Sequence, residues 1–374
     1  MPSKGTPGKF RAISPTFELS RLDDMPSEIE KRKADHISLA AEGDVGFRRT
    51  TTLFECVRLV HEALPDLHAD RIDTTLELFG KRLRAPIFIA AMTGGTEQAH
   101  SINRELASIA EERGYGFGLG SQRPMYVDPS KTPSFCVRDV APSALVLGNI
   151  GMVQARSMCS DEVQKLADVV GADALCVHLN PAMEIIQPGG DRDFEEGEVT
   201  LARLVRDLSV PIVVKETGCG ISARTARRLR AVGVRHVDVS GAGGTSWVAI
   251  ETERASGKVR ALGEALREWG IPTAASVAQV ASVGMETVIA TGGITSGLDI
   301  AKAIALGAHA AGIARPVLKA LLSGGRKAAE SFLESVEAEL RAAMLLVGAK
   351  DLDALRKAPK VVVGELSAWI EHSS

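Results

Sequence analysis

The chain has 374 residues, of which 45 % are hydrophobic and 24 % are charged, an ordinary composition for a globular protein. The net charge of −3 gives no reason to expect nucleic acid or an anionic membrane as a partner, and no run approaches the roughly 18 apolar residues of a membrane span. Five cysteines without CxxC spacing, and a start without an apolar leader, predict a cytoplasmic protein with free thiols.

The first residues differ in character from the rest of the chain. Residues 1–29 are rich in Pro, Ser and Lys and lack periodicity, which predicts a flexible N-terminal arm. From about residue 86, short apolar runs alternate with amphipathic stretches of helical periodicity. The apolar runs are 86–92, 115–120, 144–150, 174–179, 211–216, 236–240, 287–291 and 310–314. These eight units predict an α/β protein, a (β/α)8 TIM barrel that forms a single domain over residues 30–374.

Two further segments lie outside this alternation. Residues 269–277, WGIPTAASV, are a possible ninth strand in the long connection before the seventh strand. Residues 326–350 have the periodicity of a C-terminal amphipathic helix. Neither segment marks a second domain.

Polar residues and glycines follow the predicted strands at the ends where a barrel carries its active site. They are Thr93, Ser121, Asn149, His178 with Asn180, Lys215, Ser240, Gly292 with Gly293, and Ala314 with Arg315. Each of them alone is also typical of a helix cap or a loop. Their recurrence around the ring predicts one shared site at the mouth of the barrel.

Three glycine-rich segments predict anion binding. TGGITSG (291–297) follows the seventh predicted strand, and GIARPVL (312–318) follows the eighth. Backbone N–H groups at such turns and at helix N-termini bind phosphate, and TIM barrels often place a phosphate site after these two strands. SGAGGTSW (240–247) adds a third loop, although a plain tight turn explains its composition equally well.

Lys215 ends the fifth predicted strand, within PIVVKETGCG (211–220). A lysine inside a barrel mouth is costly unless it meets an anion, which favours contact with an electron-rich ligand such as a flavin. The alternative is a side chain that extends to the rim, where water solvates the ammonium group.

Longer motifs resemble a known family. RKADHI (32–37), AAMTGGT (90–96), GLGSQR (118–123), HLNPAMEIIQPGGDRDF (178–194) and ATGGITSGLDIAKAIALGA (290–308) are similar to segments of type 2 isopentenyl-diphosphate isomerase. The resemblance runs from about residue 30 to about residue 350. It implies a flavin-dependent barrel that forms a homotetramer or homo-octamer. Such an enzyme interconverts isopentenyl and dimethylallyl diphosphate with reduced FMN and Mg²⁺, and NADPH is the implied reductant.

Carried over residue by residue, the resemblance implies two adjoining ligand sites. FMN would be bound by Met92, Thr93, Gly94, Ser121, Asn149, Lys215, Ser240, Thr245, Gly293, Ile294, Ala314 and Arg315. The prenyl diphosphate would be bound by Arg32, Lys33, His36, Ser121, Gln122, Arg123, His178, Asn180 and Met183, and Mg²⁺ by Glu184. Arg and Lys side chains suit a diphosphate, and a carboxylate suits Mg²⁺. By residue type alone, the basic stretch would equally be a solvated helix start and Glu184 a solvated loop acid.

The implied reaction adds a proton to the terminal alkene carbon and removes one from C2, without net redox change. Reduced anionic FMN would take part in proton transfer and stabilise a developing cation, with Lys215, His178 and position 183 at the reacting groups. Trp247 would face this pocket through its ring or belong to the core.

One position departs from the family pattern. Met183 occupies the place of a family Gln, and its thioether donates no proton and accepts hydrogen bonds only weakly. Three outcomes follow as expectations: a slowed isomerase, a related enzyme acting on another prenyl diphosphate, or a catalytically weak or silent prenyl-diphosphate-binding protein. A hydroxy-acid oxidase would share the barrel but would need a His-Gly-x-Arg cluster, and the sequence contains no His-Gly pair.

Overall fold

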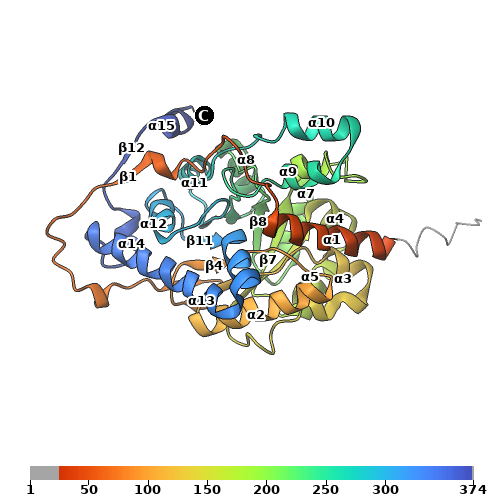
Figure 1. Ribbon diagram of the computed structural model, residues 1–374, viewed down its shortest axis with the longest axis horizontal. Coiled ribbons are helices and arrows are strands. Elements are labelled where there is room, and N and C mark those ends of the chain that lie inside the picture. The colour runs from red at the N-terminus through yellow and green to blue at the C-terminus, as the bar shows by residue number, and fades with distance from the viewer. Residues whose placement is uncertain (1–24, 373–374) are drawn as a thin grey trace, which may run out of the picture.

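The computed structural model describes residues 25–372, and a closed barrel of eight parallel strands lies at its centre (Figure 1). The strands follow one another around the barrel in chain order, and the last pairs with the first. They are β4 (Ile87–Ile89), β5 (Gly116–Gly118), β6 (Leu145–Gly151), β7 (Ala174–Leu179), β8 (Ile212–Glu216), β9 (His236–Asp238), β10 (Thr287–Ala290) and β11 (Ala310–Ile313). Each predicted run overlaps one of these strands, so the predicted (β/α)8 barrel is confirmed.

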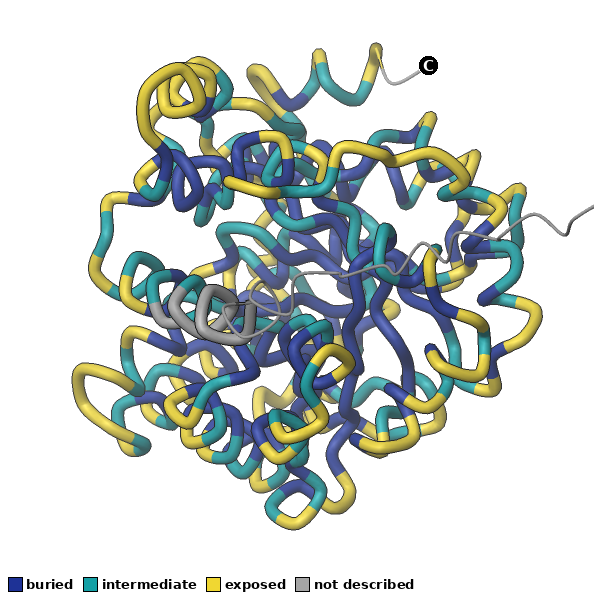
Figure 2. The backbone as a smooth tube through the Cα atoms, turned by 90° about the vertical axis from the view of Figure 1, so that its right-hand side faces the viewer, coloured by how far each residue is buried: buried dark blue, intermediate teal, exposed yellow. Residues whose placement is uncertain are grey.

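Successive residues along each strand face opposite sides of the barrel wall. In β4, Ile87 and Ile89 pack outward with the helices, whereas Phe88 packs with a cluster inside the barrel. The inner cluster also contains Leu145, Leu147, Ala174, Cys176, Val213, Ile289 and Ala310. Figure 2 shows that the strands at the centre of the molecule are buried. They separate two apolar layers, one inside the barrel and one beneath the helices. The same alternation turns Lys215, two residues after Val213, toward the inside of the mouth.

Helices surround the barrel, and none of those in the described part of the chain is long and apolar enough to cross a membrane. The α-helices are α1 (Met25–Glu42), α2 (Glu97–Arg113), α3 (Arg123–Val127), α4 (Met152–Ser157), α5 (Ser160–Val170), α6 (Pro181–Glu184), α7 (Gly197–Asp207), α8 (Ala223–Ala231), α9 (Trp247–Arg254), α10 (Gly257–Ala265), α11 (Thr273–Ser282), α12 (Gly297–Ala305), α13 (Arg315–Leu346), α14 (Leu352–Arg356) and α15 (Glu365–Glu371). Short 3₁₀ helices are η2 (Phe54–Cys56), η3 (Ala69–Arg71) and η4 (Pro129–Phe135). Helix α1 packs against α9 and α13.

Two small antiparallel pairs were not foreseen. Strands β2 (Leu76–Leu78) and β3 (Lys81–Leu83) form a hairpin, and Leu78 and Leu83 join the inner cluster beside Phe88. The hairpin therefore closes the barrel at the N-terminal ends of its strands, opposite the mouth. Strand β1 (Val57–Leu59) pairs with β12 (Lys360–Val362), which ties the early part of the described chain to its end.

Three expectations need correction. The possible ninth strand at 269–277 is wrong, because helix α11 begins at Thr273 and only Pro272 makes a bridge, to Ala242. The expected helix over 326–350 is the second half of α13, which is broken at Gly325 by a φ of 68°. Helix α1 begins at Met25, inside the expected arm, and residues 1–24 of that arm lie outside the described residues.

Candidate active site

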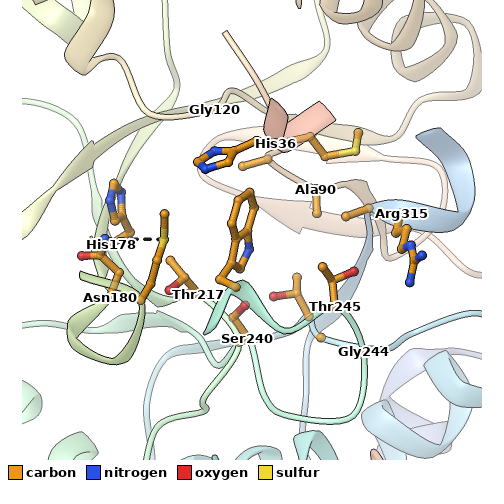
Figure 3. A pocket seen from close by; sticks show the side chains of 18 of the residues that line it. His36, Ala90, Gly120, His178, Asn180, Thr217, Ser240, Gly244, Thr245 and Arg315 are labelled. Carbon is orange, nitrogen blue, oxygen red and sulfur yellow. Dashed lines mark hydrogen bonds between the residues drawn. The ribbon is translucent and has the colours of Figure 1, made fainter. Parts of the chain in front are cut away.

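A cavity of about 580 Å³ opens at the C-terminal ends of the barrel strands, beneath α1. It collects most of the predicted site residues: Arg32, Lys33, His36, Met92, Ser121, Arg123, Asn149, His178, Asn180, Met183, Glu184, Lys215, Ser240, Thr245, Trp247, Gly293, Ile294, Ala314 and Arg315. Figure 3 shows His178 and Asn180 across the cavity from Arg315, with Ser240, Gly244 and Thr245 along another side. The sequence prediction of a single shared site at the mouth therefore agrees with the structure.

Three predicted residues do not line this cavity. Gln122 is fully buried: its amide nitrogen donates to Leu166 O at 2.7 Å and its amide oxygen accepts from Asn149 N at 2.8 Å. The expectation that the Gln122 side chain meets the substrate is therefore corrected, because both ends of its amide are engaged within the barrel wall. Thr93 and Gly94 lie behind the cavity wall, where an added Cβ at Gly94 would come within 2.1 Å of the Phe135 ring.

Lys215 is held by a buried polar network. Its ammonium nitrogen donates to Asp238 Oδ2 at 2.8 Å and to Thr291 Oγ1 at 3.0 Å. Asp238 was missed at the sequence level, where it sits inside the apolar run 236–240. A carboxylate within such a run was the available signal, because a buried charge is rare unless it is paired.

His178 has a defined tautomer. Asn149 donates its amide N–H to Leu119 O at 3.0 Å, so its amide oxygen faces His178 Nδ1 at 2.8 Å. Because an amide oxygen only accepts, Nδ1 of His178 carries the proton and Nε2 presents a lone pair. Burial, together with the nearby charges of Lys33 and Lys215, lowers the pKa of His178 to about 3. The imidazole is therefore neutral and offers the cavity an acceptor rather than a donor.

Glu184 is the centre of a second network at the end of β7. It is buried and accepts from Asn180 Nδ2 at 2.7 Å, Gln187 Nε2 at 3.2 Å and Asp191 N at 2.8 Å. Met183 lies beside this network, with its sulfur 4.0 Å from Asn180 Nδ2. A carboxylate has about four acceptor positions, so one remains on Glu184 for a cation. This hard oxygen donor at the cavity edge fits Mg²⁺, which commonly takes one or two carboxylates together with substrate phosphate oxygens.

Helix α1 is fastened over the mouth at two places. His36 Nε2 lies 2.7 Å from Oε1 of the fully buried Glu251, which also pairs with Arg254 at 2.7 Å. The His36 ring packs edge-on to Trp247 with centroids 5.1 Å apart, so Trp247 is both a packing residue and part of the cavity wall. Arg315 donates to the carbonyls of residues 40 and 43 at 2.7 and 2.6 Å, at the C-terminal end of α1.

Three cationic residues line the cavity together: Arg32 and Lys33 on α1, and Arg123 at the start of α3. Burial, and then the charges of Arg32 and Arg123, lower the pKa of Lys33 to about 8. Burial and the charge of Arg123 also lower the pKa of Arg32, whose Nε is buried without a hydrogen-bond partner in the described structure. Like charges crowded in this way indicate a site for a polyanion, because an anion removes their repulsion.

The opposite side of the cavity is a glycine cradle, formed by Gly243, Gly244, Gly292 and Gly293. All four line the cavity, and a Cβ at Gly244 would lie 2.4 Å from Gly293 N. Backbones this close leave no room for side chains, while their N–H groups remain near the cavity. Helix α13 begins at Arg315, and the first N–H groups of a helix have no intrahelical partners. They are therefore available to an anion bound at the cradle. Together with the apolar residues 90–92, which also line the cavity, the cradle fits a phosphorylated ring cofactor such as FMN.

Several cavity residues escaped sequence reasoning. They are Gly46, Phe47, Gln154, Gln187, Thr217, Gly218 and Lys319, among others. Thr217 and Gly218 directly follow β8, and their position after a strand was the signal that could have found them. Gly46 and Phe47 follow α1 and reach the mouth through the bridge of Gly46 to Thr245, a long-range pairing that no local pattern announces.

Comparisons with known proteins agree with this geometry. The FMN-dependent dehydrogenase family matches the chain over residues 26–183 and 180–361. A protein of Methanothermobacter thermautotrophicus named isopentenyl-diphosphate delta-isomerase is 44 % identical over 345 residues, which cover 92 % of this chain and 96 % of that protein. A protein of the same name from Halobacterium salinarum is 44 % identical over 353 residues, covering 92 % and 97 %.

Solved structures show the same architecture at low identity. A mandelate oxidase variant with an FMN adduct superposes with a TM-score of 0.60 at 19 % identity and covers 92 % of this chain and 99 % of that one. Another, with (S)-mandelic acid, has a TM-score of 0.62 at 18 % identity and covers 91 % and 98 %. At this identity the likeness concerns the fold alone. The relatives, by contrast, are similar along nearly their whole length, and the chain belongs to the type 2 isopentenyl-diphosphate delta-isomerase family.

Proposed function

We propose that this protein interconverts isopentenyl and dimethylallyl diphosphate, with reduced FMN on the glycine cradle and Mg²⁺ between Glu184 and the substrate. The observation that carries the proposal is the cavity itself, which joins a cradle for a phosphorylated cofactor to a pocket of three cations. The names of the relatives support the reaction, and the FMN-dependent family supports the cofactor. NADPH as reductant, a cytoplasmic location and a homotetrameric or homo-octameric state are further parts of the proposal, and they rest on the resemblance.

The glycine cradle would bind FMN, and the cluster of Arg32, Lys33 and Arg123 would bind the diphosphate. Gly293, Ile294, Ala314 and the start of α13 would bind the FMN phosphate, and Lys215 would contact the ring. When bound in its reduced form, the flavin would supply negative charge and a site of proton exchange. Lys33 and Arg123 would bind the diphosphate as a point charge and a planar fork, respectively.

Residues at the end of β7 would orient the diphosphate. Glu184 keeps one acceptor position for Mg²⁺ and is fixed by its bonds to Asn180, Gln187 and the Asp191 backbone. His178 presents a lone pair at Nε2, so we assign it an accepting role, toward a water or the Lys33 ammonium, in place of direct donation to phosphate. Helix α1 and Trp247 would exclude water from the reacting carbons, which strengthens every charge interaction inside.

Met183 supports a second candidate within the same site, an enzyme acting on another prenyl diphosphate. Its side chain lines the cavity and adds a flexible apolar surface among polar groups. Such a surface would accommodate a longer prenyl chain.

The test incubates the FMN-loaded, chemically reduced protein with labelled isopentenyl diphosphate and Mg²⁺ and separates the products. The proposal predicts conversion to the allylic isomer, with loss of activity when Mg²⁺ is chelated. A second arm offers geranyl and farnesyl diphosphates. Binding or conversion of these, without any isomerisation of the C5 substrate, would replace the isomerase assignment by the second candidate.

A further inference from the structure

At the floor of the cavity, Lys215, Asp238 and Thr291 form a closed ring of hydrogen bonds. Lys215 is the penultimate residue of β8, opposite its register partner Asp238 at the end of β9, and Thr291 directly follows β10. The three side chains come from neighbouring strands, and all three residues are buried. Strand alternation turns them inward, one layer above Val213 and Ile289 of the inner apolar cluster.

The direction of each hydrogen bond in this ring is fixed by its chemistry. A carboxylate only accepts, so the Thr291 hydroxyl donates to Asp238 Oδ1 at 2.5 Å. The hydroxyl oxygen then accepts from Lys215 at 3.0 Å, while Lys215 also donates to Asp238 Oδ2 at 2.8 Å. The backbone N–H of Ser240 approaches Asp238 Oδ1 at 3.3 Å and fixes the carboxylate further.

The ring leaves Lys215 with one unused N–H. An ammonium group has three N–H donors, and two of them point into the ring. Lys215 and Thr291 both line the cavity, whereas Asp238 does not. The ammonium group thus lies between a buried negative charge beneath it and the ligand space above it. Because two hydrogen bonds hold the ammonium group, the direction of its third N–H is fixed.

We infer that Asp238 is a positioning residue that acts on the cofactor through Lys215. It holds the ammonium group against the ligand and offsets part of its positive charge, so that the charge felt by a bound flavin is smaller than that of a free lysine. This inference rests on the proposed FMN site. Because reduced anionic flavin gains more from a nearby cation than oxidised flavin does, the Asp238 carboxylate lowers the midpoint potential of the bound cofactor.

The test measures that midpoint potential in the FMN-loaded protein by spectroelectrochemical titration. Asp238→Asn keeps the shape of the side chain and removes its charge, so the potential should become more positive. We expect at least a tenfold shift of the reduction equilibrium, which is about 30 mV for a two-electron couple. Thr291→Ser, which keeps the hydroxyl, should retain the parent potential.

A double-mutant cycle separates this role from a structural one. In a Lys215→Met background the buried Asp238 carboxylate has lost its cation, and an unpaired buried carboxylate takes up a proton and becomes neutral. Asp238→Asn should then leave the potential nearly unchanged. A folded, yellow Asp238→Asn protein with the parent potential would overturn the inference, as would a shift that persists in the Lys215→Met background. Should Asp238→Asn fail to fold, Thr291→Val gives the second test: it removes one bond to Lys215 and should also move the potential. A parent protein that binds no flavin would instead overturn the FMN assignment, which is a distinct outcome because no flavin spectrum appears.

Discussion

Met183 lies among side chains whose hydrogen bonds are largely complete, and it contributes none of comparable strength. Its nearest polar contact is a 4.0 Å approach to Asn180, which already donates to Glu184 at 2.7 Å. Position 183 is also on the short helix α6, so its side chain is placed by the same turn that places Glu184. An amide at this position would reach the cavity with both a donor and an acceptor, without disturbing the carboxylate.

Met183→Gln should therefore raise the isomerase turnover number. A hydrogen bond to a charged group contributes about 1.5–3 kcal/mol, so an amide that orients the reacting groups should raise the turnover number roughly tenfold or more. Turnover is measured with labelled isopentenyl diphosphate on the reduced holoenzyme. Met183→Leu, which keeps an apolar side chain of similar size, is the matched control and should stay at the parent rate. An equal rate for the Gln and Leu variants would contradict a catalytic role for position 183.

Lys33 gives diphosphate binding a pH dependence. Its pKa in the ligand-free protein is lowered to about 8 by burial and by Arg32 and Arg123, so it loses its proton as the pH rises through 8. The ligand prefers the charged form, and the affinity for inorganic pyrophosphate should fall above pH 8, by at most tenfold per pH unit. His36 and His178, whose pKa values are lowered, are already neutral in this range.

Calorimetric titration between pH 7 and 9.5 checks this dependence. Lys33→Arg remains charged throughout, so its affinity for pyrophosphate should change little over this pH range. Any change that this variant does show reports ionisation of the ligand and is subtracted from the curve of the parent. Lys33→Gln should bind weakly at every pH. A parallel decline in the parent and the Arg variant would show that another group titrates.

At the scale of elements, α1 is placed by contacts far from it in sequence. The buried Glu251 on α9 connects His36 to Arg254, and Arg315 at the start of α13 binds the carbonyls that end α1. The sequence motif RKADHI predicted which residues would face the ligand, yet it offered no sign of Glu251, because α9 contributes it from a position 215 residues away. Residues 269–277 failed for a different reason: a short apolar run does not distinguish a buried helix from a strand.

Glu251→Gln should loosen α1 without emptying the flavin site. Glu251→Gln removes the charge that accepts the hydrogen bond across the contact between α9 and α1. A hydrogen bond to a charged group contributes about 1.5–3 kcal/mol, and the substitution removes part of this. We expect faster amide hydrogen exchange in residues 32–42 and roughly tenfold weaker binding of pyrophosphate, with an unchanged FMN content. Glu286→Gln, which removes a carboxylate from an exposed ion pair with Arg235, is the control and should resemble the parent. Unchanged exchange in α1 would show that Glu251 does not hold it.

At the scale of the whole molecule, the barrel was predictable because eight apolar runs each provide both an inner and an outer face. The mouth was predictable for a related reason: the residues at strand ends of a closed parallel barrel meet at one edge. What the sequence did not reveal depends on contacts between distant segments, such as the pairing of β1 with β12 and the packing of the β2–β3 hairpin against the opposite end of the barrel. Gln122 was misassigned because it follows a strand like its neighbours but turns into the wall, where it supports Asn149.

The glycine cradle links cofactor binding to the stability of the entire barrel. A ligand that binds only the folded state at 100 times its dissociation constant adds about 2.7 kcal/mol, which for a chain of this size raises the melting temperature by about 3 °C. Gly293→Ala should abolish that FMN-dependent rise, because its φ of 72° strains an alanine and the new Cβ would lie 2.4 Å from Thr52 Cγ2. Gly197→Ala is the matched control, since no atom lies within 4 Å of its Cβ position. Melting curves with and without FMN compare the two. If Gly293→Ala kept the full rise, the phosphate would have to bind elsewhere in the mouth, and α13 would be the next candidate.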